Sequence, residues 1–395
     1  MLHENFLILM QVKEIMSKEI FGLQSGDTVT KFISLMEEHH VHEAPVFDGR
    51  KFLGMVRFNS LATRNISDPS KQKVSGLIDF KPPEISPEQT IEQAAEALSR
   101  TGLRALPVIE KNSVVGILSI WDILDYASGI KSFKSTAVEQ LMVAPHVILK
   151  DDDLGKVRVL MLEKNISRVP VVDDSGKLAG IVAVHDLLKA FKQPRERMGW
   201  YSMAAEMDKI YSLPVSTVMN SSPPTASRKD SLSSAIEKMK KFRHSGLTVV
   251  ENNFPVGIIT IKDLLEFFVG SLKKKGVYYQ ISGVEDEDID IMETVDRMVR
   301  DTLQKINPMV PVQYFFMHVK KHKVKLTKAK YTVRTRLMTD RGIFISKDWD
   351  WDLRTATDKA LNNLERQFMK SHDIGKTKLI KGRKLMKDIL KNSGE

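Results

Sequence analysis

The sequence has no cysteine among its 395 residues. Disulfide bonds, a thiolate nucleophile and a cysteine-based zinc site are therefore excluded. It also has no apolar run near the roughly 18 residues that cross a bilayer, and the patch from Phe6 to Met10 lacks the flanks of a signal peptide. We therefore expect a cytoplasmic protein of about two to three domains, with no membrane partner.

Most of the chain has no excess of positive charge. Residues 1 to 270 hold 33 basic and 33 acidic side chains, whereas residues 271 to 395 hold 27 basic and 17 acidic ones. The last part therefore carries the whole formal charge of +10. Such an asymmetry predicts that the two parts of the chain have different functions.

One pattern occurs four times in the electrically balanced part. An apolar strand is followed by a polar turn, and a glycine then opens a second apolar strand that runs into a helix. A helix-period stretch precedes each pair of strands. The extra segment 193–213 accounts for the longer last interval between these glycines, which are Gly54, Gly116, Gly180 and Gly257. A unit of about 55 to 60 residues cannot easily bury its sheet alone, which favours pairing of neighbouring copies.

The order [LV]-P-V-V-[DE], polar turn, G-h-h-[ST]-x-x-D-h-h resembles the CBS domain, the regulatory repeat of cystathionine β-synthase. Four copies span residues 12 to 268, which makes the resemblance specific. It implies two Bateman modules, with repeats 1 and 2 in residues 1–130 and repeats 3 and 4 in residues 131–270. It also implies a homodimer and an adenine nucleotide (AMP, ADP or ATP) in the clefts between paired repeats.

The motif is complete in the second and fourth copies. By resemblance, its aspartate binds ribose, its hydroxyl residue reaches phosphate, and its glycine lets backbone approach the ligand. These residues are Gly116, Ser119 and Asp122, and Gly257, Thr260 and Asp263. The third copy keeps Asp186 but has Ala183 in place of the hydroxyl residue, and the first has Arg57 and Ser60 at the two positions. We therefore expect at most one well-formed site per module.

A structural role competes with the nucleotide role. Ser-x-x-Asp and Thr-x-x-Asp at the start of an apolar helix also have capping-box spacing, and both roles can coexist. Basic residues just before the strand pairs are candidates for further phosphate contacts: Arg100, Arg104, Arg168, Arg243 and His244. His39, His40 and His42 are better explained by a surface turn than by a metal site. No catalytic triad or Walker-type loop is visible, so we expect neither an enzyme nor a metal cofactor.

The basic part predicts a small α+β domain over residues 276–372, followed by a basic tail, 373–395. Strands are expected at 277–282, 312–320, 328–338 and 342–345, and helices at 288–306 and 352–371. The resulting β-α-β-β-β-α sandwich has one sheet face covered and one open. The strand 328–338 alternates cleanly between apolar residues such as Val333 and Leu337 and cations such as Arg334 and Arg336. The whole chain is thus expected to be an α/β and α+β multidomain protein.

This order, and the run from Tyr331 through Leu364-Glu365-Arg366-Gln367 to Lys370, resemble the ribosome hibernation-promoting factor family (protein Y). Members bind the small ribosomal subunit near the decoding centre, where they occlude messenger and transfer RNA. By resemblance, Arg366 and Lys370 contact phosphates of ribosomal RNA (rRNA). Joined to CBS repeats, the domain indicates an archaeal type of factor.

Charge density supports an RNA surface independently of this resemblance. Ten basic residues and one acid, Asp340, lie between His318 and Lys347, and such a cluster attracts a polyphosphate backbone. The predicted rRNA-binding residues are Lys320, Lys321, Lys323, Lys325, Lys328, Lys330, Arg334, Arg336, Arg354, Arg366 and Lys370. The alternative is a solvated lysine-rich surface, as in thermophile proteins. Trp349 and Trp351 could stack on bases, but packing is preferred for at least one of them.

Together these features predict a nucleotide-sensing ribosome hibernation factor that blocks translation and, as a homodimer, could link two subunits. Two other hypotheses stay open at this point. One is a CBS-regulated protein that binds other RNA. The other is a CBS scaffold that regulates an enzyme in trans.

Overall fold

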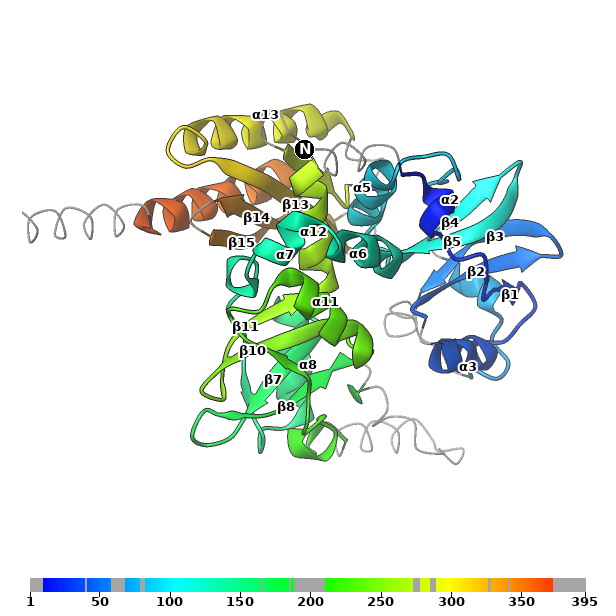
Figure 1. The fold of residues 1–395 in the computed structure, drawn as a ribbon, viewed down its shortest axis with the longest axis horizontal. Helices are drawn as coiled ribbons and strands as arrows, with labels where there is room; N and C mark the ends of the chain where they lie inside the picture. Colours follow the sequence, from blue (N-terminus) through cyan, green and yellow to red (C-terminus); the bar gives the residue numbers. More distant parts are fainter. Residues whose placement is uncertain are drawn as a thin grey trace, which may run out of the picture. The chain divides into compact units, whose positions relative to one another are not determined.

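The computed structural model describes eleven stretches of the chain, and its course is drawn in Figure 1. They are residues 10–39, 41–57, 68–78, 82–164, 166–184, 186–187, 210–272, 278–284, 289–325, 328–339 and 342–371. The chain divides into two compact units, Met1–Ser119 with Phe267–Glu395, and Ile120–Glu266. None of the described helices is long and apolar enough to cross a membrane.

Each of the four repeats contains an antiparallel strand pair and a preceding helix, as the sequence predicted. In the first repeat, β2 (Glu43–Asp48) pairs with β3 (Lys51–Arg57), and the short β1 (Leu23–Gln24) runs parallel to β2. The other pairs are β4 (Ala105–Glu110) with β5 (Ser113–Ser119), β7 (Arg168–Val172) with β8 (Leu178–Ala183), and β10 (Gly246–Glu251) with β11 (Phe254–Thr260). Short parallel strands β6 (Ile148–Leu149) and β9 (Thr225–Ala226) complete the third and fourth sheets.

The repeat helices follow from local sequence signals. They are α3 (Val29–His39), α5 (Ile91–Thr101), α8 (Leu154–Lys164) and α11 (Leu232–Lys241). In α5, the Thr90 hydroxyl accepts a hydrogen bond from the Gln93 backbone N–H, and the Gln93 side chain accepts one from the Thr90 N–H. Gly102 ends the helix with φ of 65°, a conformation that glycine adopts at low cost. The apolar face of α5, with Ile91 and Leu98, is buried in the repeat.

Backbone bridges join the repeats in pairs, first with second and third with fourth. In the first pair they link Gln11 with Thr90, Ser17 with Ile117 and Thr28 with Lys73. The corresponding positions are bridged in the other pair: Ala137 with Ser231, Val143 with Ile258 and Asp153 with Pro214. The same three links therefore build both modules, which is the tandem pairing expected from the sequence. The exact domain limits remain a prediction.

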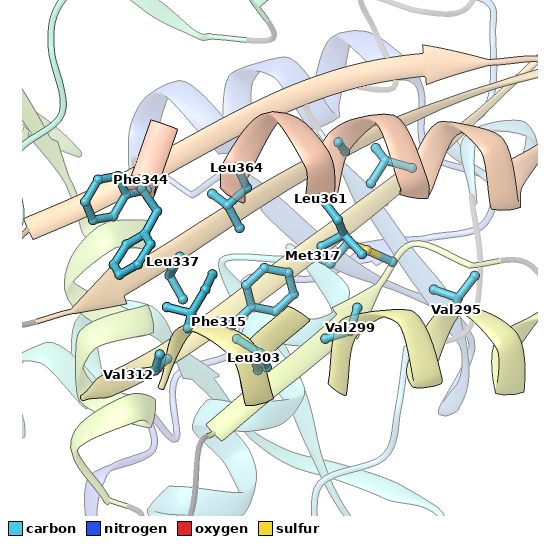
Figure 2. Close-up of a cluster of buried hydrophobic side chains, with 14 of the residues drawn as sticks. Val295, Val299, Leu303, Val312, Phe315, Met317, Leu337, Phe344, Leu361 and Leu364 are labelled. Atoms are coloured by element: carbon cyan, nitrogen blue, oxygen red, sulfur yellow. The ribbon is translucent and has the colours of Figure 1, made fainter. Parts of the chain in front are cut away.

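The C-terminal part is a four-stranded sheet with helices on one face, in the predicted β-α-β-β-β-α order. The strands lie in the order β12 (Tyr278–Ser282), β13 (Val312–Lys325), β14 (Lys328–Thr339) and β15 (Gly342–Asp350). Helix α13 (Ile289–Ile306) and a helix over residues 353–371 pack against the sheet. Figure 2 shows Leu303, Leu364 and Phe315 in the core between these helices and the strands.

The opposite sheet face is only partly open, which corrects the expectation of one fully open face. Tyr314 is 1% exposed, and its ring packs edge-on against Phe316, with centroids 5.1 Å apart. A Cβ atom added at Gly270, near the end of α12 (Ile261–Leu272), would lie 2.6 Å from the Tyr314 ring. Arg336, on β14 opposite Phe316, is therefore 8% exposed rather than lying in solvent.

Candidate functional site

The complete motif of the fourth repeat forms a hydrogen-bonded turn where β11 meets α12. The backbone N–H and the hydroxyl of Thr260 both donate to Asp263 Oδ2, at 2.7 and 2.8 Å, and Asp263 is 6% exposed. This is the capping arrangement that the spacing also predicted. The ribose-binding role of Asp263 stays a prediction.

The other copies differ at this turn as their sequences do. In the third repeat, the Ala183 backbone N–H donates to Asp186 Oδ2 (2.9 Å), so the turn is kept without the hydroxyl. In the second, Ser119 ends β5, and Asp122 lies in the first turn of α6 (Ile120–Ser128). Ser60, in the first copy, lies outside the described residues. Thr260 and Asp263 are thus a complete motif pair whose hydrogen bonds the structure describes.

The motif glycines make room for protein rather than only for a ligand. A Cβ atom on Gly116 would lie 2.7 Å from the backbone oxygen of Ser17, near the start of the paired repeat. On Gly257 it would lie 2.5 Å from the sulfur of Met142, again near the start of the paired repeat. These glycines therefore permit the close packing of two repeats, and the predicted approach of a ligand to them stays a prediction.

Two arginines considered as phosphate contacts lie at equivalent boundaries between paired repeats. Nη2 of Arg168 donates to the Ser245 hydroxyl (2.5 Å) in the second module. In the first, the backbone N–H of Arg104 donates to Glu43 Oε1 (3.2 Å). Burial raises the pKa of Glu43 to about 7, although the positive charges of Arg104 and Arg57 act in the opposite direction.

The half-buried carboxyl of Glu43 predicts that the stability of the first module depends on pH. Because the pKa of Glu43 is raised on folding, its contribution to stability is present below about pH 4.5 and is lost as pH rises through about 7, by up to about 3 kcal/mol. Hydrogen exchange of the β2 and β3 amides in the full chain, between pH 5 and pH 8, measures this after correction for intrinsic exchange rates. The Glu43→Gln variant should lack the decrease. A difference between the wild type and this variant that does not change with pH contradicts the assignment.

Three rows of mostly basic side chains, with one threonine and one tryptophan, form a second candidate site, on the face of the C-terminal sheet away from its helices. Successive strand residues point to opposite faces, and Phe315, Met317 and Val319 are buried under the helices. The residues between them therefore point to the other face. The rows are His318–Arg334–Lys347, Lys320–Thr332–Trp349 and His322–Lys330. We call these eight residues the cationic face; none of them is acidic.

Three cations of this face act on the charge of His322. The pKa of His322 is lowered, first by partial burial and then by the positive charges of Lys320, Lys330 and Lys347. Lys320 alternates with core residues along β13, and strand pairing places Lys330 opposite His322 and Lys347 in the row of His318, so the three lysines lie on one side of the sheet. This side of the sheet therefore groups cations from three strands.

The predicted rRNA-binding residues do not all belong to this face. Arg354, Arg366 and Lys370 are exposed on the helix 353–371, which covers the other side of the sheet. Lys321 also points to that side, with its ammonium 5.6 Å from the centre of the Tyr331 ring. The side chains of Lys323, Lys325 and Lys328 lie outside the described residues.

Some of the charged side chains on the helix side form ion pairs. Lys359 lies 2.6 Å from Asp350, and Lys305 lies 3.4 Å from Glu365. Along α13, Arg300 pairs with Asp296 at 2.8 Å.

Sequence reasoning missed His318, His322, Lys347 and Trp349 as members of one surface. The fourth strand of the basic domain was expected to end at Ile345, where the apolar alternation stops. In the structure, β15 continues to Asp350 and stays paired with β14. Extending the two-residue period past Ser346 would have placed Lys347 and Trp349 on the same face.

Among the described residues, no group of histidine and carboxylate side chains could hold a metal ion. His39 stacks on Phe21, with ring centroids 3.7 Å apart. His40 lies outside the described residues. The described part of this region thus offers no metal site.

Comparisons with known proteins agree with both resemblances. A model of the CBS domain matches residues 12–64, 74–129, 138–193 and 215–270. A model described as hibernation factor Hib, C-terminal domain, matches residues 278–387. The predicted combination of four CBS repeats with a hibernation-factor domain is therefore confirmed.

Similar proteins occur in archaea. Uncharacterized protein MJ1404 of Methanocaldococcus jannaschii is 24% identical over 94% of both chains. An uncharacterized 33.4 kDa protein in a ribosomal RNA operon of Thermofilum pendens is 25% identical over 61% of this chain and 85% of its own. The crystal structure of protein MJ1225 from M. jannaschii superposes on 66% of this chain and 100% of its own, with a TM-score of 0.53 and 20% identity. The last match shows the fold of the repeats.

Proposed function

The chain belongs to the CBS-domain proteins and carries a C-terminal domain that matches hibernation factor Hib, and on this premise we propose that it is a nucleotide-sensing ribosome hibernation factor. It binds the small ribosomal subunit through the cationic face and blocks translation there. Its role is regulatory rather than catalytic, and its place is the cytoplasm. As a homodimer it presents two cationic faces, which suits the linking of two subunits.

The observation that supports this proposal most directly is the clustering of Lys320, Lys330 and Lys347 around His322. Phosphate groups attract such a cluster. Binding releases the counterions condensed on the RNA, so the affinity for RNA falls steeply as the salt concentration rises. Phosphate contacts position a protein without reading sequence. Selectivity for the small subunit would then come from the shape of its folded RNA.

Sedimentation of the full chain with purified small subunits across a range of salt concentrations tests this binding. The protein should sediment with the subunits at low salt and be released as salt rises. Absence of sedimentation at every salt concentration rejects the proposal. Recovery of free RNA or of a single enzyme from cell extract, in place of ribosomal proteins, supports the two other hypotheses.

The regulatory ligand proposed for the paired repeats is AMP, ADP or ATP. Asp122 and Asp263 bind the ribose hydroxyls, while Ser119 and Thr260 approach the phosphates. The support is the complete motif in these two copies and the ordered turn around Asp263. Asp186, in the copy without the hydroxyl, is the weaker candidate.

Calorimetric titration with each nucleotide can rank these clefts. Asp122→Ala or Asp263→Ala should weaken binding about tenfold or more, since each removes charge-assisted hydrogen bonds to ribose. Asp186→Ala is the matched control, because it removes the same carboxylate from a turn that lacks the hydroxyl, and it should change affinity by less than about threefold. Unchanged binding in both test variants discards the site assignment.

A further inference from the structure

Two exposed tryptophans lie at the end of the cationic face. Trp349 is 46% exposed and Trp351 is 53% exposed, although packing was expected for at least one of them. Their rings meet edge to face, with centroids 6.2 Å apart and an interplanar angle of 88°. Neither ring is inserted into the core, so the pair does not act as a hydrophobic anchor for the following helix.

The acids of the Asp-Trp-Asp-Trp-Asp run are separated from the rings. Asp348 and Asp350 alternate with Trp349 along β15 and therefore point to the helix side. Asp350 pairs with Lys359, which holds the pKa of the carboxyl below its usual value. Asp348 Oδ2 accepts a hydrogen bond from the Asn363 side chain (2.6 Å). These two carboxylates thus contact side chains of the final helix and point away from the cationic face.

A cation of the cationic face lies directly on the ring pair. Nζ of Lys330 is 3.7 Å from the centre of the Trp349 ring, a close cation–π contact. The same ammonium contributes to the lowered pKa of His322. Aromatic surface and positive charge are therefore continuous across β13, β14 and β15.

Exposed aromatic rings beside cations match the chemistry of a nucleotide. A base stacks on an aromatic ring, and its phosphate is attracted to an ammonium group. Bases inside a duplex are already stacked on their neighbours and offer no free face. The favoured partner is therefore an unpaired nucleotide.

We propose that Trp349 and Trp351 stack on an unpaired RNA base while Lys330 contacts an adjoining phosphate. This inference rests on the proposed function and deepens it, because it assigns a looped or single-stranded segment of RNA to one end of the cationic face. The remaining cations follow the phosphate backbone away from that base.

Fluorescence anisotropy of the full chain with two labelled RNAs tests the inference. One is a single strand of about 12 nucleotides, and the other is the same strand in a duplex. Trp349→Ala/Trp351→Ala should weaken single-strand binding about tenfold or more and change duplex binding by less than about twofold. Trp349→Phe/Trp351→Phe should restore most of the single-strand affinity, because phenylalanine keeps an aromatic face.

The control variant Lys320→Ala removes a cation but no ring, and it should weaken the binding of both RNAs equally. The inference is overturned if the double alanine variant binds the single strand as the wild type does. It is also overturned if the double alanine variant loses affinity for both RNAs to the same extent. Loss of subunit binding while single-strand binding is kept would indicate a protein contact and overturns the inference as well. Failure of the wild type to bind either RNA or the subunit overturns the proposed function itself. Hydrogen exchange of the β14 and β15 amides verifies that the variants are folded.

Discussion

The triple variant Lys320→Glu/Lys330→Glu/Arg334→Glu is expected to lose affinity for the small ribosomal subunit by about a thousandfold. The three cations occupy the three rows of the cationic face, so their reversal replaces attraction by repulsion over the whole surface. The slope of log affinity against log salt should also become shallower by about 0.7 to 0.9 for each phosphate contact removed. Sedimentation at several salt concentrations measures both quantities.

The matched control reverses the charge at three positions on the helix side, in the variant Arg354→Glu/Arg366→Glu/Lys370→Glu. Net charge changes equally, but these side chains lie on the covered side of the sheet, so only screened long-range attraction is lost. The expected decrease in affinity is less than about tenfold. A larger loss in the helix variant than in the strand variant would contradict the choice of face. It would favour Arg366 and Lys370, the contacts implied by the family resemblance.

Saturating nucleotide is expected to change the affinity for the small subunit by about 5- to 150-fold, the usual range of coupling between two sites. Linkage requires the subunit to change the affinity for nucleotide by the same factor. Titrations of each ligand in the presence and absence of the other measure the two factors independently. Their equality is a stronger result than either change alone.

The double variant Asp122→Ala/Asp263→Ala provides the control for this coupling. It should bind the subunit as the nucleotide-free wild type does, and it should not respond to added nucleotide. Equal subunit affinity with and without nucleotide in the wild type would contradict a sensing role. Subunit binding by the cationic face would be unaffected by that outcome.

The limits of β15 show where a periodic pattern stops being informative. Apolar alternation ends after Ile345 because Ser346, the next residue on the core side, is polar. The structure buries Ser346 at 3% exposure, with its hydroxyl 2.8 Å from Thr335 Oγ1 and donating to the Ala360 carbonyl. A buried hydroxyl with these partners costs little. The strand therefore continues past the point where hydrophobicity alone would end it.

Arg336 shows a different limit of alternation. The two-residue period correctly assigned it to the face away from the helices. It lies opposite Phe316, beside the buried Tyr314, against which the end of α12 packs at Gly270, and these segments come from other parts of the chain. Contact between such distant segments leaves no periodic signal at residue 336.

By itself, the sequence determined the four repeats, their pairwise organisation, the capping turns at Thr260 and Asp263, and the basic domain with its order of elements. These features depend on local spacing, which is readable along one chain. Only the tertiary structure decided which cations share a surface, because strand register and helix packing bring residues together across long separations. It placed Lys320, Lys330 and Lys347 with two tryptophans and put Arg354, Arg366 and Lys370 on the other side of the sheet.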